Sequence, residues 1–325
     1  MTKPNKLRVA YISNGDPEFS TENDVRRAFE SLGHTVIMCQ ENRLDWDVLW
    51  SYDYDLLLVT STWSNVAPLE QFLDLFKGCA DRNIPTATLH LDTFWGVSRG
   101  DRKWWRESMF HTAYIFTADG DYQDKWKALG KNHIHLPPAC RHDAAHFGTF
   151  REEYQADVGF AGSNGTGYHE NEWPYRKQLV DKLREICATN GWSFSNPGGE
   201  LDKPDAGKIS RGEDMNDWYS SVKVTVGDSL CLKREQSRYN SDRIPEANAR
   251  GGFLIMPRID FLEEYYGGIF SFYSWGDWAD LEKQIRHFLE NEDERNEITK
   301  ANQKHYAENH TYVNRVQTIL KTVGL

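Results

Sequence analysis

The sequence lacks the features that would place the protein in a membrane, in a disulfide framework or around a structural metal. No segment approaches the roughly 18 consecutive apolar residues of a membrane-spanning helix. The N-terminal residues run directly into an apolar strand, without the apolar core and cleavage site of a secretory signal, so we expect a cytoplasmic protein. The five cysteines are scattered and form no CxxC pair, which argues against disulfides and structural zinc.

The chain also lacks an excess of basic residues. Its formal net charge is -11 at pH 7, which disfavours a general attraction to nucleic acid. A local basic patch is still compatible with this charge. The 12 tryptophans are a high number, and we expect some of them to bind sugars or bases as well as to fill cores.

Apolar strands alternate with helices along both halves of the 325-residue chain, which predicts two doubly wound α/β domains. The predicted domains are residues 1–148, residues 149–309, and a terminal helix over 310–325 that packs back toward the first domain. Ligands bind beyond the carboxyl ends of strands in such sheets. The strands of the first domain are predicted at 7–13, 35–39, 55–60, 86–91, 114–117 and 134–136, and those of the second at 156–161, 192–195, 222–226, 253–256 and 269–273.

The segment YNSDRIPEANARGGFLIMP, residues 239–257, contains the most informative charged residues. It predicts a short amphipathic helix, a turn at Gly251 and Gly252, and a buried strand. Glu246, in the first turn, is favoured there by the helix dipole, but it could equally accept hydrogen bonds from the hydroxyls of a ribose. Arg243 has a guanidinium suited to phosphate. A capped helix with a solvated Arg and Glu is the alternative interpretation.

This segment resembles the donor-nucleotide segment of GT-B glycosyltransferases, most closely the CgeB-like, spore-maturation-type branch. Two other passages resemble the same family, HTYVNRV at 310–316 and FTADGDYQDKWKALGKNHIHLPPACRHDAAHF at 116–147. The resemblance implies a GT-B fold, with two Rossmann-like domains facing each other across a cleft and C-terminal helices crossing back. It also implies a nucleotide-sugar substrate, expected to be a UDP-sugar, whose ribose is held by Glu246.

The loop GSNGTG at 162–167 is a second candidate for the donor side. It matches neither a P-loop nor a dinucleotide GxGxxG motif, and a flexible connection explains it equally well without the resemblance. The cations between the strand at 222–226 and Glu246 suit a diphosphate leaving group, or form a solvated basic loop. The expected donor-binding residues are Gly162, Ser163, Asn164, Arg176, Lys233, Arg234, Tyr239, Asn240, Arg243 and Glu246.

The candidate catalytic residues are Asp92, Asp16 and His90, at strand ends of the first domain. An inverting transfer needs a carboxylate or a histidine beside the acceptor hydroxyl, whereas a retaining transfer can proceed without an obvious side-chain base. The resembled family tends to keep an acid at the position of Asp92. Asp16 and Asp92 could each cap a turn or helix instead.

The stretch RGDRKWWR, residues 99–106, alternates cations with two tryptophans. Such a pattern suits flipped-out bases, and it equally suits a sugar acceptor because indole rings stack on sugars. A surface helix with a half-buried tryptophan is the alternative. The expected acceptor-binding residues are Trp63, Trp95, Arg102, Lys103, Trp104 and Trp105.

The sequence therefore predicts a metal-independent glycosyltransferase that uses a nucleotide sugar as substrate and needs no cofactor. Its acceptor is open between a small molecule, a glycan, a protein and a modified DNA base in a phage context. Two alternatives are a nucleotide-sugar epimerase or hydrolase of the same fold, and a non-catalytic module that binds a nucleotide sugar.

Overall fold

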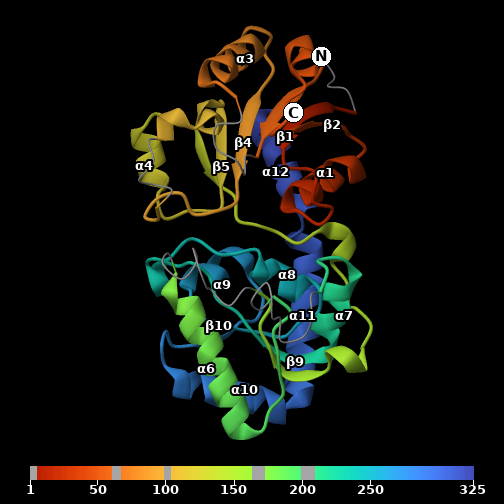
Figure 1. The fold of residues 1–325 in the computed structure, drawn as a ribbon, viewed down its shortest axis with the longest axis vertical. Coiled ribbons are helices and arrows are strands. Elements are labelled where there is room, and N and C mark those ends of the chain that lie inside the picture. The colour runs from red at the N-terminus through yellow and green to blue at the C-terminus, as the bar shows by residue number, and fades with distance from the viewer. Residues whose placement is uncertain (1–5, 61–66, 99–103, 163–172, 199–208) are drawn as a thin grey trace. The chain divides into compact units, whose positions relative to one another are not determined.

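The structure, a computed structural model, describes residues 6–60, 67–98, 104–162, 173–198 and 209–325 (Figure 1). The chain divides into two compact units, of which the first contains Met1–Pro138 with Tyr312–Leu325 and the second contains Ala139–Thr311. The segment after Pro138 packs within the second unit. There, Nδ2 of Asn216 donates hydrogen bonds to the carbonyl oxygens of Ala144, at 2.9 Å, and His146, at 2.8 Å.

The first unit contains a six-stranded parallel sheet with the strand order β2-β1-β3-β4-β5-β6. Each strand overlaps a range predicted from the sequence, which confirms the doubly wound α/β class for this half. The strands are β1 (Arg8–Ser13), β2 (Thr35–Gln40), β3 (Leu56–Val59), β4 (Thr86–His90), β5 (Tyr114–Thr117) and β6 (His133–His135). The α-helices between them, in the described ranges, are α1 (Thr21–Ser31), α2 (Trp46–Ser51), α3 (Leu69–Asp81) and α4 (Gln123–Ala128).

An aromatic core fills the space between this sheet and helices α3 and α4. The Phe110 ring lies 4.7 Å from the Phe94 ring and 4.8 Å from the Trp126 ring, measured between centroids. Alternate residues of β1, Ala10 and Ile12, face the same cluster, as the two-residue period of a strand requires. This packing fixes the strand ends from which the loops of the first unit emerge.

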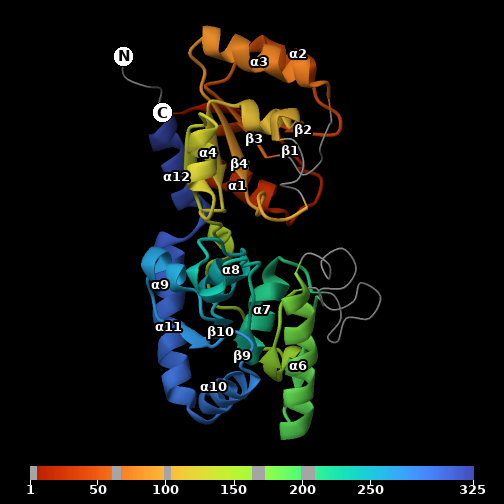
Figure 2. The ribbon, with the colours of Figure 1, turned by 90° about the vertical axis from the view of Figure 1, so that its left-hand side faces the viewer.

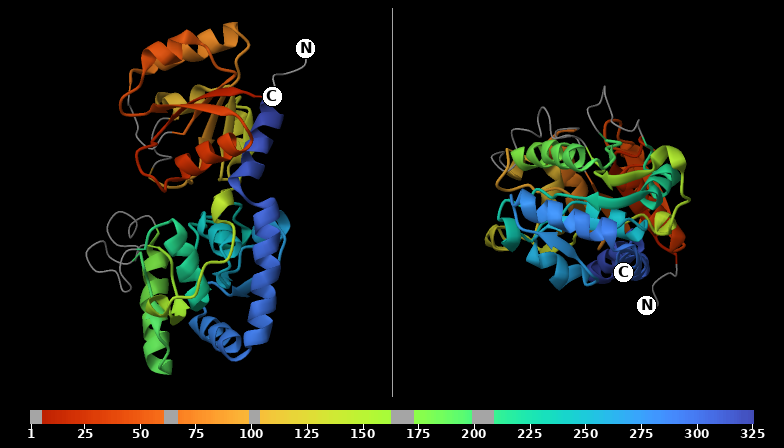
Figure 3. Two further views of the ribbon diagram at one scale, coloured as in Figure 1. Left: turned by 90° about the vertical axis from the view of Figure 1, so that its right-hand side faces the viewer. Right: turned by 90° about the horizontal axis from the view of Figure 1, so that it is seen from below.

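The C-terminal helix α12 (Tyr312–Val323) completes the first unit. It packs beside α1 and buries Val316 and Ile319 (Figure 3). The buried Arg315 donates from Nε to the carbonyl oxygen of Pro137 at 2.7 Å and from Nη2 to that of Pro138 at 3.1 Å. The last residues of the chain are thereby joined to the segment that follows β6.

The second unit contains a five-stranded parallel sheet with the order β11-β10-β9-β7-β8. Its strands also overlap the predicted ranges. They are β7 (Ala156–Gly159), β8 (Phe194–Ser195), β9 (Val222–Val226), β10 (Leu254–Pro257) and β11 (Ser271–Tyr273).

Helices cover both faces of this second sheet. Apolar side chains of α6 (Pro174–Asn190) and α10 (Trp278–Glu290) pack on one face. Those of α7 (Glu213–Ser221), α8 (Arg243–Ala249), α9 (Asp260–Tyr266) and α11 (Glu292–Asn309) pack on the other. Figure 2 shows α6 and α11 on opposite sides of β9 and β10. None of the helices in the described ranges has the length and apolar composition of a membrane span.

Candidate active site

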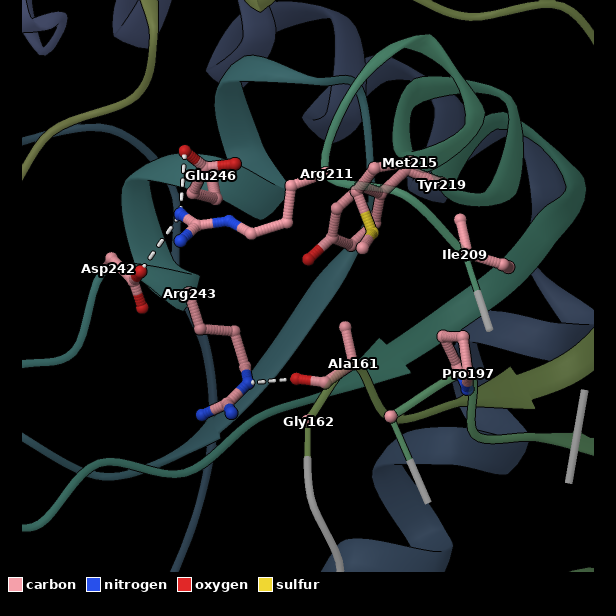
Figure 4. A pocket seen from close by; sticks show the side chains of 11 residues that line it. Ala161, Gly162, Pro197, Ile209, Arg211, Met215, Tyr219, Asp242, Arg243 and Glu246 are labelled. Carbon is pink, nitrogen blue, oxygen red and sulfur yellow. Dashed lines mark hydrogen bonds and ion pairs between the residues drawn. The ribbon is translucent and has the colours of Figure 1, made fainter. Parts of the chain in front are cut away.

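A pocket of about 300 Å³ lies in the second unit, beyond the carboxyl ends of β7 and β8 (Figure 4). This is where ligands bind in open parallel sheets. Residues that follow the two strands form one part of its wall, and residues of α7, α8 and the segments before them form the rest. The lining residues are Ala161, Gly162, Pro197, Gly198, Ile209, Arg211, Met215, Tyr219, Asp242, Arg243 and Glu246.

Glu246 contributes a carboxylate to this pocket. Its Oε2 accepts a hydrogen bond from Nε of Arg250 at 2.6 Å. Its Oε1 is buried, has no hydrogen-bond partner among the described residues, and lies 3.5 Å from Nη2 of Arg211. The guanidinium of Arg211 lies between two carboxylates, since it is also 3.0 Å from Oδ2 of Asp242 (Figure 4). One oxygen of Glu246 is thus fixed, while the other keeps its capacity to accept hydrogen bonds.

Arg250 fixes Glu246 from the protein interior. Its side chain is 1% exposed and donates to the carbonyl oxygens of Gly212, at 3.2 Å, and Arg211, at 3.1 Å, and to Oδ1 of Asn216. Burial alone would lower the pKa of the Arg250 guanidinium, but the neighbouring groups, with the Glu246 carboxylate first among them, together raise it. Arg250 therefore stays charged. It links the Glu246 carboxylate to the backbone carbonyl oxygens of Arg211 and Gly212 by hydrogen bonds.

Asp228, fully buried two residues beyond β9, binds two arginines. Its Oδ1 accepts a hydrogen bond from Nη1 of Arg243 at 2.8 Å, and its Oδ2 accepts from Nε of Arg176 at 3.1 Å. Trp173 Nε1 also donates to Oδ2, at 2.9 Å. Burial alone would raise the pKa of the Asp228 carboxyl, but the two guanidiniums hold this pKa below its usual value. One fixed negative charge therefore holds two positive charges, and this cluster carries a net charge of +1.

Two glycines allow the guanidinium of Arg243 to reach the pocket. A Cβ on Gly162 would lie 2.5 Å from Nη2 of Arg243, which is shorter than a van der Waals contact allows. A Cβ on Gly198 would lie 2.5 Å from the backbone of Gly162. Arg243 is further held by a hydrogen bond from its Nε to the carbonyl oxygen of Ala161, at 2.7 Å (Figure 4). The absence of side chains at 162 and 198 is thus a steric requirement of the site.

The remaining wall of the pocket is mainly apolar. Ile209, Met215 and Pro197 line it together with the ring of Tyr219 (Figure 4). A carboxylate that can accept hydrogen bonds, a guanidinium fixed beside it and an apolar surface suit a ligand with hydroxyls, an anionic group and a flat ring. A nucleotide has all three.

The structure brings together three of the predicted donor-binding residues, Gly162, Arg243 and Glu246, in the pocket lining. Arg176 joins them through Asp228. Ser163 and Asn164 lie outside the described residues.

Four other predicted donor residues do not line the pocket. Lys233 and Arg234 are exposed. Tyr239 is buried, and its carbonyl oxygen accepts a hydrogen bond from Sγ of Cys231 at 3.2 Å. Asn240 is also buried, with Nδ2 2.9 Å from the hydroxyl of Tyr266. The structure therefore gives Tyr239 and Asn240 internal packing contacts.

The candidate catalytic residues of the first unit lie at the ends of β1 and β4. Asp16 forms an ion pair with Arg43, with 2.7 Å between Oδ1 and Nη2. His90 ends β4 and packs edge to face against Phe94 and Phe110. Asp92, two residues further on, is exposed. Because β3 separates β1 from β4, Asp16 and Asp92 follow strands that are not neighbours in the sheet.

The predicted acceptor residues differ in exposure. Trp95 is only 4% exposed, lies in the aromatic core, and has Nζ of Lys125 3.7 Å from its ring centroid. Trp105 is 49% exposed, and Trp104 is half-buried with its ring stacked on that of His111. Of these three, Trp105 is the most exposed. Trp63, Arg102 and Lys103 lie outside the described residues.

Sequence reasoning missed three residues that shape the pocket, namely Arg211, Tyr219 and Asp228. Asp228 had a usable signal, since it lies two residues beyond β9, as Asp92 lies two residues beyond β4. Arg211 and Tyr219 had none, because nothing local in the sequence indicates that the start of α7 meets α8.

Two parallel-sheet α/β units, with a charged pocket beyond strand ends of the second, define a protein with the GT-B glycosyltransferase fold. A family model described as "Glycosyl transferase-like" matches residues 158–321, which are 164 of the 325 residues. The chain belongs to this glycosyl transferase-like family. No curated protein matches the sequence significantly.

Solved glycosyltransferase structures share this fold along almost the whole chain. An alpha-glucosyltransferase in complex with UDP-glucose and DNA containing an abasic site has a TM-score of 0.66 at 10% identity, covering 98% of this chain and 100% of that one. A sucrose-phosphate synthase from Thermosynechococcus elongatus has a TM-score of 0.61 at 11% identity, with 97% and 98% covered. HepE from Anabaena, in complex with UDP and glucose, has a TM-score of 0.56 at 11% identity, with 98% and 99% covered.

Proposed function

We propose that the protein transfers a sugar from a UDP-sugar, bound in the pocket of the second unit, to a hydroxyl of an acceptor. Glu246 accepts hydrogen bonds from the ribose hydroxyls, and Arg243, with Arg176 behind it, faces the diphosphate. As the glycosidic bond breaks, the negative charge on the leaving diphosphate grows, and the fixed guanidinium stabilises it. We propose that arginines rather than a metal ion supply this positive charge. Within the family, the three sequence passages described above favour the CgeB-like branch.

The observation that carries this proposal is Oε1 of Glu246. It is a buried oxygen that forms a 3.5 Å ion pair with Nη2 of Arg211 but has no hydrogen-bond partner in the described part of the chain, and the other oxygen of the same carboxylate is held at 2.6 Å by a buried guanidinium. Leaving such an acceptor unsatisfied is costly, and a ligand hydroxyl would satisfy it. The similar structures that contain UDP or UDP-glucose support the choice of donor.

Calorimetric titration of UDP tests the donor site. Glu246→Gln keeps the size of the side chain and removes its charge, so UDP binding should weaken by about 1.5–3 kcal/mol, the usual contribution of a charged hydrogen bond. Glu264→Gln is the matched control, because Glu264 forms an exposed ion pair with Arg238 in the same unit, away from the pocket. UDP affinity that is equal in wild type and Glu246→Gln would remove Glu246 from the site.

We propose that the first unit holds the acceptor, with Asp92 as the base if the transfer inverts the anomeric carbon. Asp92 is exposed just beyond a strand end, where it can meet a substrate. Asp92→Asn should then lower kcat for transfer and leave UDP affinity unchanged. A variant with unchanged kcat would exclude Asp92 and leave His90 and Asp16 as candidates.

Several similar structures are complexes with DNA, so DNA containing a hydroxymethylated base is the first acceptor to test, beside sugars and small alcohols. Release of UDP only when an acceptor is present would support transfer. Release without an acceptor would indicate a hydrolase, an altered sugar an epimerase, and tight binding without release a non-catalytic module. The absence of a DNA mobility shift at low salt would exclude DNA as acceptor.

A further inference from the structure

Tyr219 contributes a hydroxyl to the wall of the pocket beside its charged residues. Tyr219 lies in α7 and is only 3% exposed, and its hydroxyl makes no hydrogen bond to the residues that the structure describes. Figure 4 shows this hydroxyl pointing into the pocket, toward the space between Arg211 and Arg243. A hydroxyl that opens into a pocket and makes no hydrogen bond within the protein is available to a ligand, whose oxygen atoms can accept its hydrogen bond.

The ring of Tyr219 is held in place, so the hydroxyl has a defined position. The ring packs edge to face on Trp218, with 5.0 Å between centroids. A Cβ on Gly252 would lie 2.5 Å from Cδ1 of Tyr219, which shows how closely the backbone approaches the ring. Burial raises the pKa of the Tyr219 hydroxyl and is the largest influence on it. The Arg243 guanidinium lowers this pKa, and the Glu246 carboxylate raises it. The hydroxyl therefore keeps its proton at neutral pH and acts as a donor.

We propose that the Tyr219 hydroxyl donates a hydrogen bond to the α-phosphate of the bound nucleotide. This inference rests on the proposed function, in which Glu246 marks the ribose and Arg243 marks the diphosphate. The hydroxyl points toward the space between Arg211 and Arg243 (Figure 4). Arg211 lies next to Glu246. The group that joins a ribose to a diphosphate is the α-phosphate, and its oxygens accept hydrogen bonds strongly. Tyr219 would thus discriminate a nucleotide from a nucleoside.

Tyr219→Phe removes one oxygen atom and keeps the ring that packs on Trp218 and Gly252. The measurement is calorimetric affinity for uridine, UMP and UDP, with the thermal midpoint of each variant as a check of folding. We expect affinity for UMP and UDP to fall by about tenfold or more, as for a hydrogen bond to a charged group, while affinity for uridine stays within about twofold. Tyr265→Phe, which removes a hydroxyl of the same unit outside the pocket lining, should change none of the three.

Two results would overturn the inference. Equal losses for uridine, UMP and UDP would move the contact to the ribose or the base. Unchanged affinity for UMP and UDP would show that the hydroxyl does not contact the nucleotide. The proposed function can be judged separately. If the wild type binds UDP and Glu246→Gln weakens this binding, the donor site is supported even if Tyr219→Phe has no effect. Wild type that binds neither UMP nor UDP would overturn both.

Discussion

The guanidinium of Arg243 and the carboxylate of Asp228 form a buried ion pair, with 2.8 Å between Nη1 and Oδ1 and side-chain exposures of 9% and 0%. Nη1 of Arg243 also donates to the backbone carbonyl oxygen of Asp228, at 2.8 Å. The pair is therefore held at two points, and Arg243 has little freedom to turn away from the pocket.

Asp228→Asn should destabilise the second unit strongly. The substitution leaves two buried guanidiniums, those of Arg243 and Arg176, without a compensating charge, and removing one partner of a buried ion pair costs about 3–5 kcal/mol. Urea denaturation at neutral pH measures the loss. Asp217→Asn is a comparison with a smaller expected loss, because its partner Arg151 is 44% exposed and can be solvated. An equal loss in both variants would contradict the argument from burial.

The same ion pair predicts a pH dependence. The pKa of Asp228 lies below its ordinary value of 3.8, so its contribution to stability is present above that value and is lost as the pH falls through the lowered pKa. The free-energy difference between wild type and Asp228→Asn should be constant from about pH 5 to pH 8 and should shrink only below about pH 4. A difference that already shrinks between pH 8 and pH 5 would indicate another titrating group.

Gly162→Ala should weaken UDP binding by about tenfold with a smaller effect on folding. Its methyl group would lie 2.5 Å from Nη2 of Arg243, so the guanidinium must move away from the pocket. Gly276→Ala is the control, because Gly276 also has a positive φ, of +75°, in the second unit but has open space around it. That variant should lose some stability and retain UDP affinity. Equal UDP affinity in Gly162→Ala and wild type would show that the position of Arg243 is not critical.

Two tryptophans predicted to bind the acceptor should behave differently. Trp95→Ala removes a core side chain and should cost about 3–5 kcal/mol of unfolding free energy. Trp105→Ala removes an exposed ring and should leave stability within about 0.5 kcal/mol. Denaturation curves measure both, and only Trp105→Ala is then suitable for acceptor assays. A stable Trp95→Ala variant would contradict its placement in the core.

Most of the fold could be predicted from the sequence because its strands are short apolar runs separated by turn residues. The ranges around β1, β5 and β9 are examples in which local composition determines the structure. Helix α2 was not predicted, since Trp46–Ser51 is too short to show a clear helical period.

The candidate site could be predicted where its residues are neighbours in the sequence, or where, as for Gly162 and Arg176, a glycine-rich loop and the family resemblance indicated them. Glu246 and Arg243 occupy one short helix, so the sequence shows them together. Their partners Asp228, Arg211 and Tyr219 come from other segments, and only the folded sheet brings them to the same pocket. The burial of Trp95, predicted to bind the acceptor, could not be read from the sequence for a similar reason, because it depends on contacts with Phe94 and Trp126.

The first unit combines α12 with Met1–Pro138, although the whole second unit lies between them in the sequence. During translation, a ribosome therefore releases all of the second unit before it releases the helix that completes the first. The residues of the first unit that pack against α12 therefore lack this partner until α12 has been synthesised. Early termination, or removal of the last residues by a protease, would then harm the half of the molecule that was made first.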